Sequence, residues 1–290
     1  MVWYRRAPPI ANGIWALFAV SRSPVADGRS SAMKEAEWLT STDVREMYVA
    51  LRDTTTLFKT RWQGCRAVPR FAFSERKSRL FAVACCRRIL HLMPTDEARE
   101  CVLAAEQFAD GLIDEDGLNA AVEASMRSCQ QDWRVRCYSF SLAHPAVQRA
   151  AINALGRVHR QEGARASVTD AVAEAWAYST LFEAKEEYTA EKYQFLYVAE
   201  RVRQADLLRD IAGNPFRPAS VRPSWLAWND RCVERMACGI YEERAFDRLP
   251  ILHDALLDAG CDNEDILAHC RTQHEHVRGC WVIDLLLGKE

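Results

Sequence analysis

Nearly every segment after residue 32 carries the three-and-four-residue spacing of apolar side chains that is typical of amphipathic helices. Val44, Met47, Tyr48 and Leu51, for example, fall on one helical face. No stretch alternates polar and apolar residues as a half-buried strand would. The sequence therefore predicts an all-α fold, either an irregular helical bundle or an array of helical hairpins, and no fixed period indicates a regular repeat protein.

Polar capping residues and helix breakers predict where several of these helices begin and end. Asp43, Ser74, Thr95 and Asp247 each stand before an apolar periodic segment, where their side chains could accept hydrogen bonds from the first free backbone N–H groups. The run Gly213-Asn214-Pro215 is a strong stop signal after a long helical pattern. These signals predict mostly helix–loop–helix connections.

The chain is expected to contain a single all-helical domain over residues 33–290, with a more variable middle at about 111–200. Residues 1–32 are expected to be a disordered tail or an extension from a mis-assigned start codon, because the patterned sequence opens at Met33. A third alternative is a secretion signal, since Arg5-Arg6 precede the apolar run 14–20. That run is too short to cross a bilayer.

Composition limits the partners and the compartment. The 290 residues include 38 basic and 40 acidic side chains, so no overall charge draws the chain to nucleic acid or to acidic membranes. The 11 cysteines are odd in number and are not spaced like a small disulfide scaffold. We therefore expect free thiols, a reducing cytoplasmic location and no membrane association.

The C-terminal segment concentrates the residues that most readily bind metals. Cys261, His269, Cys270, His276 and Cys280 offer thiolate and imidazole ligands, which zinc prefers. Only His276 and Cys280 have the i, i+4 spacing of one helical face, and no Cys-x-x-Cys pair occurs there. The pattern favours buried cysteines with solvated or backbone-bonded histidines, so no cofactor is expected; a structural zinc ion and a catalytic metal are the alternatives.

Two further thiol sites are candidates for nucleophilic chemistry. Cys85 and Cys86 precede Arg87-Arg88, and neighbouring positive charge lowers the pKa of a thiol. Their place well inside the helix, on its apolar part, favours a packing role instead. Cys280 with His276 could form a Cys–His pair, although such pairs arise by chance in a cysteine-rich chain.

A basic segment is the candidate for nucleic-acid contact. Arginine interleaved with aromatic residues can contact phosphates and stack on bases. The many acidic residues of the chain favour a salt-bridged face instead, so nucleic acid is an unlikely partner. The residues are Arg61, Trp62, Arg66, Arg70, Phe71, Phe73, Arg76, Lys77, Arg79, Arg87 and Arg88.

Two blocks of sequence carry a resemblance. The first joins residues 33–39 to residues 79–88, and the second runs from Leu207 through Asn214-Pro215-Phe216-Arg217-Pro218 to His276-Val277-Arg278-Gly279-Cys280-Trp281. They resemble an uncharacterised family of bacterial helical proteins with many paralogues in planctomycete-type genomes. The resemblance implies a cytoplasmic bacterial protein that starts near Met33. It implies no catalytic residue, because no activity is established for the family.

No phosphate-binding glycine-rich loop, nucleophile elbow, metalloprotease helix or dinucleotide fingerprint is present in the sequence. We therefore expect a non-enzymatic interaction or scaffold protein that binds an unidentified protein partner. A small metalloprotein with a C-terminal Cys/His site, either structural or hydrolytic, is the alternative. A nucleic-acid-binding helical protein is the third candidate.

Overall fold

A computed structural model describes residues 33–51, 73–93, 95–131, 163–184, 188–272 and 274–289. The chain divides into two units, residues 1–32 and 33–290, and the first lies wholly outside the described residues, as does much of the predicted variable middle. Throughout the described part the secondary structure is helical, without a strand. The all-α prediction is confirmed.

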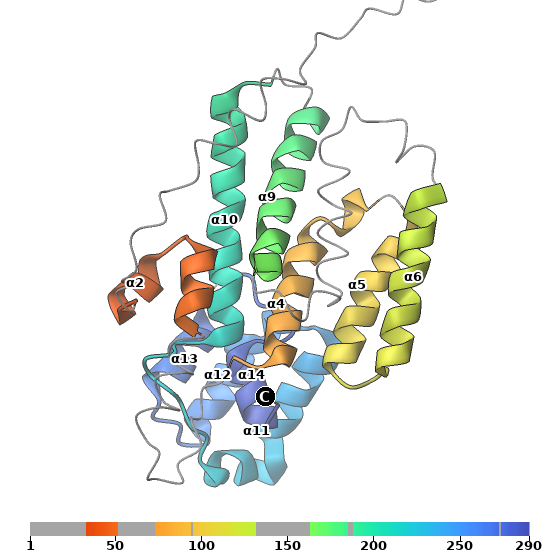
Figure 1. The fold of residues 1–290 in the computed structure, drawn as a ribbon. Helices are drawn as coiled ribbons and strands as arrows, with labels where there is room; N and C mark the ends of the chain where they lie inside the picture. Colours follow the sequence, from red (N-terminus) through yellow and green to blue (C-terminus); the bar gives the residue numbers. More distant parts are fainter. Residues whose placement is uncertain are drawn as a thin grey trace, which may run out of the picture. The chain divides into compact units, whose positions relative to one another are not determined.

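The helices up to residue 212 pack largely as neighbouring pairs. Helix α5 lies against α6, α9 lies antiparallel to α10, and α4 contacts α5, α9 and α10 (Figure 1). The elements of this first group are α2 (Glu35–Thr40), a helix over residues 44–51, α4 (Glu75–Arg88), η1 (Leu90–Leu92), α5 (Asp96–Ala109), α6 (Glu115–Gln131), α9 (Gly163–Glu183) and α10 (Ala190–Ala212).

Helix α4 is the centre of this group because its stretch 80–86 is apolar almost all round. Phe81, Val83, Cys85 and Cys86 are all buried in one core with side chains from α5, α6, α9 and α10. Burial raises the pKa of Cys86 to about 12 and that of Cys85 well above its ordinary value. Both groups are therefore neutral thiols that fill space, and the packing role predicted for them is confirmed.

The chain after α10 builds a second core. It contains α11 (Pro223–Glu243), η2 (Phe246–Arg248), α12 (Leu249–Asp258), α13 (Glu264–Arg271) and α14 (Trp281–Leu287). Helix α11 bends at residues 228–231, where Asn229, Asp230 and Arg231 adopt left-handed backbone angles. Before the bend, Trp225 is buried and its indole N–H donates to the Gly260 carbonyl at 3.1 Å, which anchors the first turn of α11.

Most of the predicted caps are present. The carboxylate of Asp43 accepts from the backbone N–H of residues 45 and 46, and Ser74 and Thr95 cap α4 and α5. Gly213 ends α10 with a φ of 68°. The prediction for Asp247 is wrong: it lies inside η2, and α12 begins after Arg248 without a side-chain cap. Pro250 in the first turn of α12 needs no N–H partner, so this helix can begin without one.

None of the helices in the described ranges combines the length and the apolar character needed to cross a lipid bilayer.

Candidate metal centre

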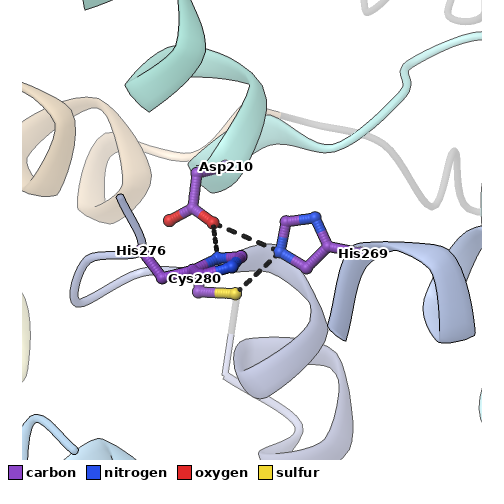
Figure 2. Close-up of side chains that lie close together, drawn as sticks. All are labelled: Asp210, His269, His276 and Cys280. Atoms are coloured by element: carbon purple, nitrogen blue, oxygen red, sulfur yellow. Dashed lines mark hydrogen bonds and ion pairs between the residues drawn. The ribbon is translucent and has the colours of Figure 1, made fainter. Parts of the chain in front are cut away.

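Four side chains from three separate segments converge where α10 meets the C-terminal helices. Asp210, His269, His276 and Cys280 each bring one ligand atom into a group whose members all lie within 4.8 Å of one another (Figure 2). Asp210 lies in the last turn of α10, His269 lies in α13, and His276 and Cys280 lie in the turn before α14. Three predicted ligands are thus together, and Asp210 joins them.

The tight turn between His276 and Cys280 depends on Gly279. Its φ of +95° belongs to glycine, and a Cβ atom there would lie 2.9 Å from Leu80 Cδ1 of α4. The turn therefore passes directly over α4 and delivers Cys280 beside the end of α10. Asn263 begins α13 by accepting from the Ile266 N–H, which places His269 on the last turn of that helix.

Asp210 is an unusual residue for its position. It is completely buried and lies at the negative end of a helix dipole, and both features oppose a carboxylate. Its Oδ1 lies 2.6 Å from His276 Nδ1 and 3.2 Å from His269 Nε2, and its Oδ2 accepts the Val277 N–H at 3.0 Å. Burial alone would raise the pKa of Asp210, but the hydrogen bonds from the surrounding histidines outweigh it and hold the pKa far below the ordinary value.

His276 is already oriented as a metal ligand would be. Its Nδ1 faces Asp210 Oδ1, while its Nε2 lies 3.3 Å from the Thr272 carbonyl oxygen. Burial lowers the pKa of His276, but Asp210 outweighs burial and the net pKa is raised. In a ligated ring the Nε2–H would still donate to Thr272, which is the second-sphere bond that fixes most metal-bound histidines.

In His269 the ring nitrogen that faces Asp210 is Nε2 rather than Nδ1. The Trp281 indole can only donate, and its N–H lies 3.0 Å from His269 Nδ1, so this nitrogen accepts. Burial is the main reason that the pKa of His269 is lowered, so the ring is neutral and carries its proton on Nε2. Coordination through Nε2 would require this proton to leave and the Trp281 indole to turn away from Nδ1.

Cys280 completes the group, but not as a nucleophile. It is fully buried, and burial followed by the charge of Asp210 raises its pKa well above that of a free thiol. Its sulfur lies 3.1 Å from His269 Nε2, so the imidazole hydrogen-bonded to it is that of His269 and not that of His276, the candidate partner in the sequence. The same Nε2 also faces Asp210, whereas a Cys–His–Asp triad needs the two partners on opposite ring nitrogens.

The remaining predicted ligands lie elsewhere. Cys261 and Cys270 are buried in the core formed by α11–α14, and burial raises the pKa of each. A further imidazole, that of His274, lies 3.6 Å from Asp210 Oδ1 and is about one-third exposed. Its ring contacts His269 edge-on and His276 in a tilted arrangement, so three histidine rings surround one carboxylate.

The donor set suits zinc. A tetrahedral ion with bonds of about 2.0–2.3 Å separates its ligand atoms by about 3.5 Å. The closest donor pairs here, at 2.6, 3.1 and 3.2 Å, are tighter by about 0.3 to 0.9 Å because they are hydrogen-bonded to each other. Binding would therefore replace these hydrogen bonds and move Asp210 and His276 apart by just under an ångström. One carboxylate, one thiolate and two imidazoles would then leave a neutral zinc centre.

Three arginines of the basic segment that lie within the described residues form ion pairs. Arg76 binds Asp284 and Asp110, Arg87 binds Glu106, and Arg88 binds Glu200 and Glu275. The salt-bridged face predicted for these arginines is therefore present. Arg61, Arg66 and Arg70 lie outside the described residues.

The sequence did not predict Asp210 as a ligand, because it lies 66 residues before His276. One signal was present: it occupies the apolar face of α10, among Leu207, Leu208 and Ile211. An acid on a buried face needs a partner.

The chain matches no protein-family model, no curated protein and no solved structure, so the geometry alone bears on its function.

Proposed function

We propose that this protein binds a structural zinc ion through Asp210, His269, His276 and Cys280, and that the ion joins the end of α10 to the C-terminal helices. The observation that carries the proposal is the convergence of four zinc-type donors, from three segments, within 4.8 Å. Four protein ligands fill a tetrahedron, and a closed site is the mark of structural zinc. A cytoplasmic location would keep the Cys280 thiol reduced and free to bind.

Elemental analysis of protein purified without chelators tests the proposal, with about one zinc ion expected per chain. Cobalt(II) replacement should then give the visible absorption of a tetrahedral ion together with thiolate-to-cobalt charge transfer. Cys280→Ala and Asp210→Asn should each weaken zinc binding at least about 100-fold, measured by competition with a chromophoric chelator.

Two matched variants separate coordination from packing. Cys261→Ala and Cys270→Ala remove buried thiols outside the four-residue group, and each should leave zinc affinity within about threefold of the parent. Circular dichroism would verify that every variant is folded. Metal-free protein that takes up no zinc, or equal losses in all four variants, would refute the site.

Binding of another protein is a second candidate function, favoured by one apolar stripe. Phe195, Val198 and Val202 follow the three-and-four-residue spacing of one α10 face, and Phe195 is 74% exposed. If this stripe binds a partner, cross-linking in native cells should reproducibly join α10 to one protein, and Phe195→Ser should abolish that cross-link. Leu112→Ser, at an exposed leucine in the turn between α5 and α6, should leave this cross-linking unchanged.

We likewise propose that the chain belongs to the planctomycete-type family. If it does and if the zinc site is real, members of that family should keep the same four zinc donors.

A further inference from the structure

A pocket of about 170 Å³ lies beside the candidate zinc centre and has a different chemical character. Its charged walls are Arg87 of α4, Glu106 of α5, Arg244 at the end of α11, and Arg278; Leu80 and Phe246 contribute apolar surface. His276 also lines it, so the pocket and the zinc centre share one residue. The volume is small beside the ~300–1,000 Å³ of most ligand pockets and suits a compact polar group.

The carboxylate in the pocket is shared by two arginines. Arg87 binds Glu106 with both prongs, Nε to Oε1 at 3.2 Å and Nη2 to Oε2 at 2.7 Å. Arg244 binds the same Oε2 from the opposite helix. Because Glu106 is only 3% exposed, its single negative charge faces two guanidinium groups in a poorly solvated setting. The wall therefore carries excess positive charge.

Arg278 contributes an unsatisfied donor. Its Nη1 lies 3.2 Å from Asp110 Oδ2, and Asp110 also binds Arg76, whose second partner is Asp284, so these two arginines are balanced by two carboxylates. The Nε–H of Arg278 is buried and has no hydrogen-bond acceptor among the described residues. A buried donor without a partner is costly, and an oxyanion in the pocket would supply the acceptor.

The backbone at Arg244 points to a role for its side chain. This residue ends α11 in the left-handed conformation, with a φ of 57°, where glycine is the usual choice. An arginine accepts backbone strain there, and the side chain so placed reaches Glu106 across the pocket.

We propose that this pocket binds a phosphate group, held by Arg87, Arg244 and Arg278. Arginine forks match the paired oxygens of phosphate, and two of the three share the single carboxylate of Glu106, which favours an anion over a neutral ligand. The group could come from free phosphate or from a small phosphate monoester. This inference does not rest on zinc, because none of the three arginines belongs to the zinc-type donor group.

Isothermal titration of the metal-free protein with inorganic phosphate and with glycerol 3-phosphate tests the proposal and separates the two sources. At least one should bind with a millimolar or tighter dissociation constant. The decisive variant is Arg244→Gly, which removes the guanidinium while leaving a residue suited to the left-handed backbone, so it should fold. It should weaken binding at least tenfold, and Arg87→Gln should do the same. The control Arg235→Gln, at an exposed arginine on the same helix, should bind like the parent.

Repeating the titration after zinc loading and removal of free zinc distinguishes the two sites. Phosphate binding that is lost in Arg244→Gly, in both the metal-free and the zinc-loaded protein, supports the pocket whether or not zinc binds. Binding that appears only with zinc and survives Arg244→Gly would place the phosphate on the metal and overturn the proposal. The absence of binding in the parent protein would overturn it as well, leaving the arginines as ion-pair partners of Glu106.

Discussion

Two polar junctions join the helices up to α10 to the helices that follow, and each pairs a buried carboxylate with basic side chains. In the first, Arg76 of α4 binds Asp284 of α14 at 2.7 Å and the Tyr241 hydroxyl of α11 at 2.7 Å. In the second, Asp210 of α10 is surrounded by histidines and faces Cys280. Both junctions cross between the same two groups of helices.

The junctions differ in whether their cations are permanent. Guanidinium groups stay charged at every ordinary pH, so the arginine junction is complete with protein atoms alone. Imidazole and thiol groups gain and lose protons near neutrality, and both bind transition metals. The same interface therefore contains a junction with a permanent charge, the permanent junction, and a junction whose groups titrate, the conditional junction; if zinc binds as proposed, the strength of the second depends on both pH and metal.

Removing the central cation of the permanent junction should have the largest effect. Arg76→Met leaves Asp284, whose side chain is 1% exposed, without its main partner. We expect a loss of about 3–5 kcal/mol in the free energy of unfolding, measured by urea denaturation. Zinc should not change this loss. The control Arg99→Met breaks an exposed pair with Asp96 and should cost no more than about 1 kcal/mol. A loss of that size for Arg76→Met would contradict the comparison.

A backbone change should weaken the conditional junction selectively. Gly279→Ala places a methyl group against Leu80 at a φ of +95°, so we expect a loss of about 1–3 kcal/mol and weaker zinc binding. Gly239→Ala is the matched control, because its Cβ would meet no atom within 4 Å inside helix α11. That variant should be stabilised by about 0.5–1 kcal/mol. Equal behaviour of the two variants would refute a special role for the Gly279 turn.

The next largest difference between the junctions should be in their dependence on pH. The raised pKa of Cys280 keeps its thiol protonated at neutral pH, and the raised pKa of His276 favours its imidazolium form. Zinc must displace these protons, so its affinity should rise about tenfold per pH unit for each one displaced, or about 1.4 kcal/mol. Chelator competition at pH 6, 7 and 8 measures this.

The metal-free protein should respond in the opposite direction. The raised pKa of His276 gives a stabilisation that is fully present below the unfolded-state pKa and disappears as the pH rises through the folded-state value. Stabilisation by zinc should therefore grow from pH 6 to pH 8. Burial lowers the pKa of Arg76 but Asp284 outweighs it, so the net pKa is raised and this guanidinium stays charged throughout. A zinc affinity independent of pH would show that thiolate and imidazole are not the ligands.

The smallest expected effect concerns the tryptophan that holds His269. Trp281→Phe removes the N–H that occupies His269 Nδ1, so the ring can carry its proton there and offer Nε2 to the metal. We expect zinc affinity to increase by up to about tenfold. In the parent protein, zinc binding should change the Trp281 fluorescence. Weaker binding by the phenylalanine variant would contradict the assigned proton positions.

Local sequence signals predicted the helices well, because caps and breakers act within a few residues. Ser74 and Thr95 cap their helices, and Gly213 ends α10. Asp247 failed because the chain forms a 3₁₀ turn there and Pro250 removes the need for a cap. The sequence could not indicate which helices pair, since packing depends on contacts between distant segments.

The candidate site was only half predictable for the same reason. The crowding of His269, His276 and Cys280 in the sequence was a useful signal, but it also favoured Cys270, which belongs to the apolar core. The spacing of His276 and Cys280 suggested a helical pair, whereas the chain turns at Gly279 and helix α14 begins only after Cys280. Asp210 could be assigned only after α10 was seen to end beside that turn.

The distance along the chain between Asp210 and His276 has a topological consequence. A bond through a metal ion would close a ring between two residues that lie 66 positions apart, as a disulfide does, and would restrict the unfolded chain in the same way. Such a closure would be reversible without any oxidant. A chelator, or a fall in free zinc, would open the ring and leave the end of α10 held to the C-terminal segment only by weaker hydrogen bonds, such as those of Asp210 with His276 and Val277, while Arg76 kept the remainder of the interface together.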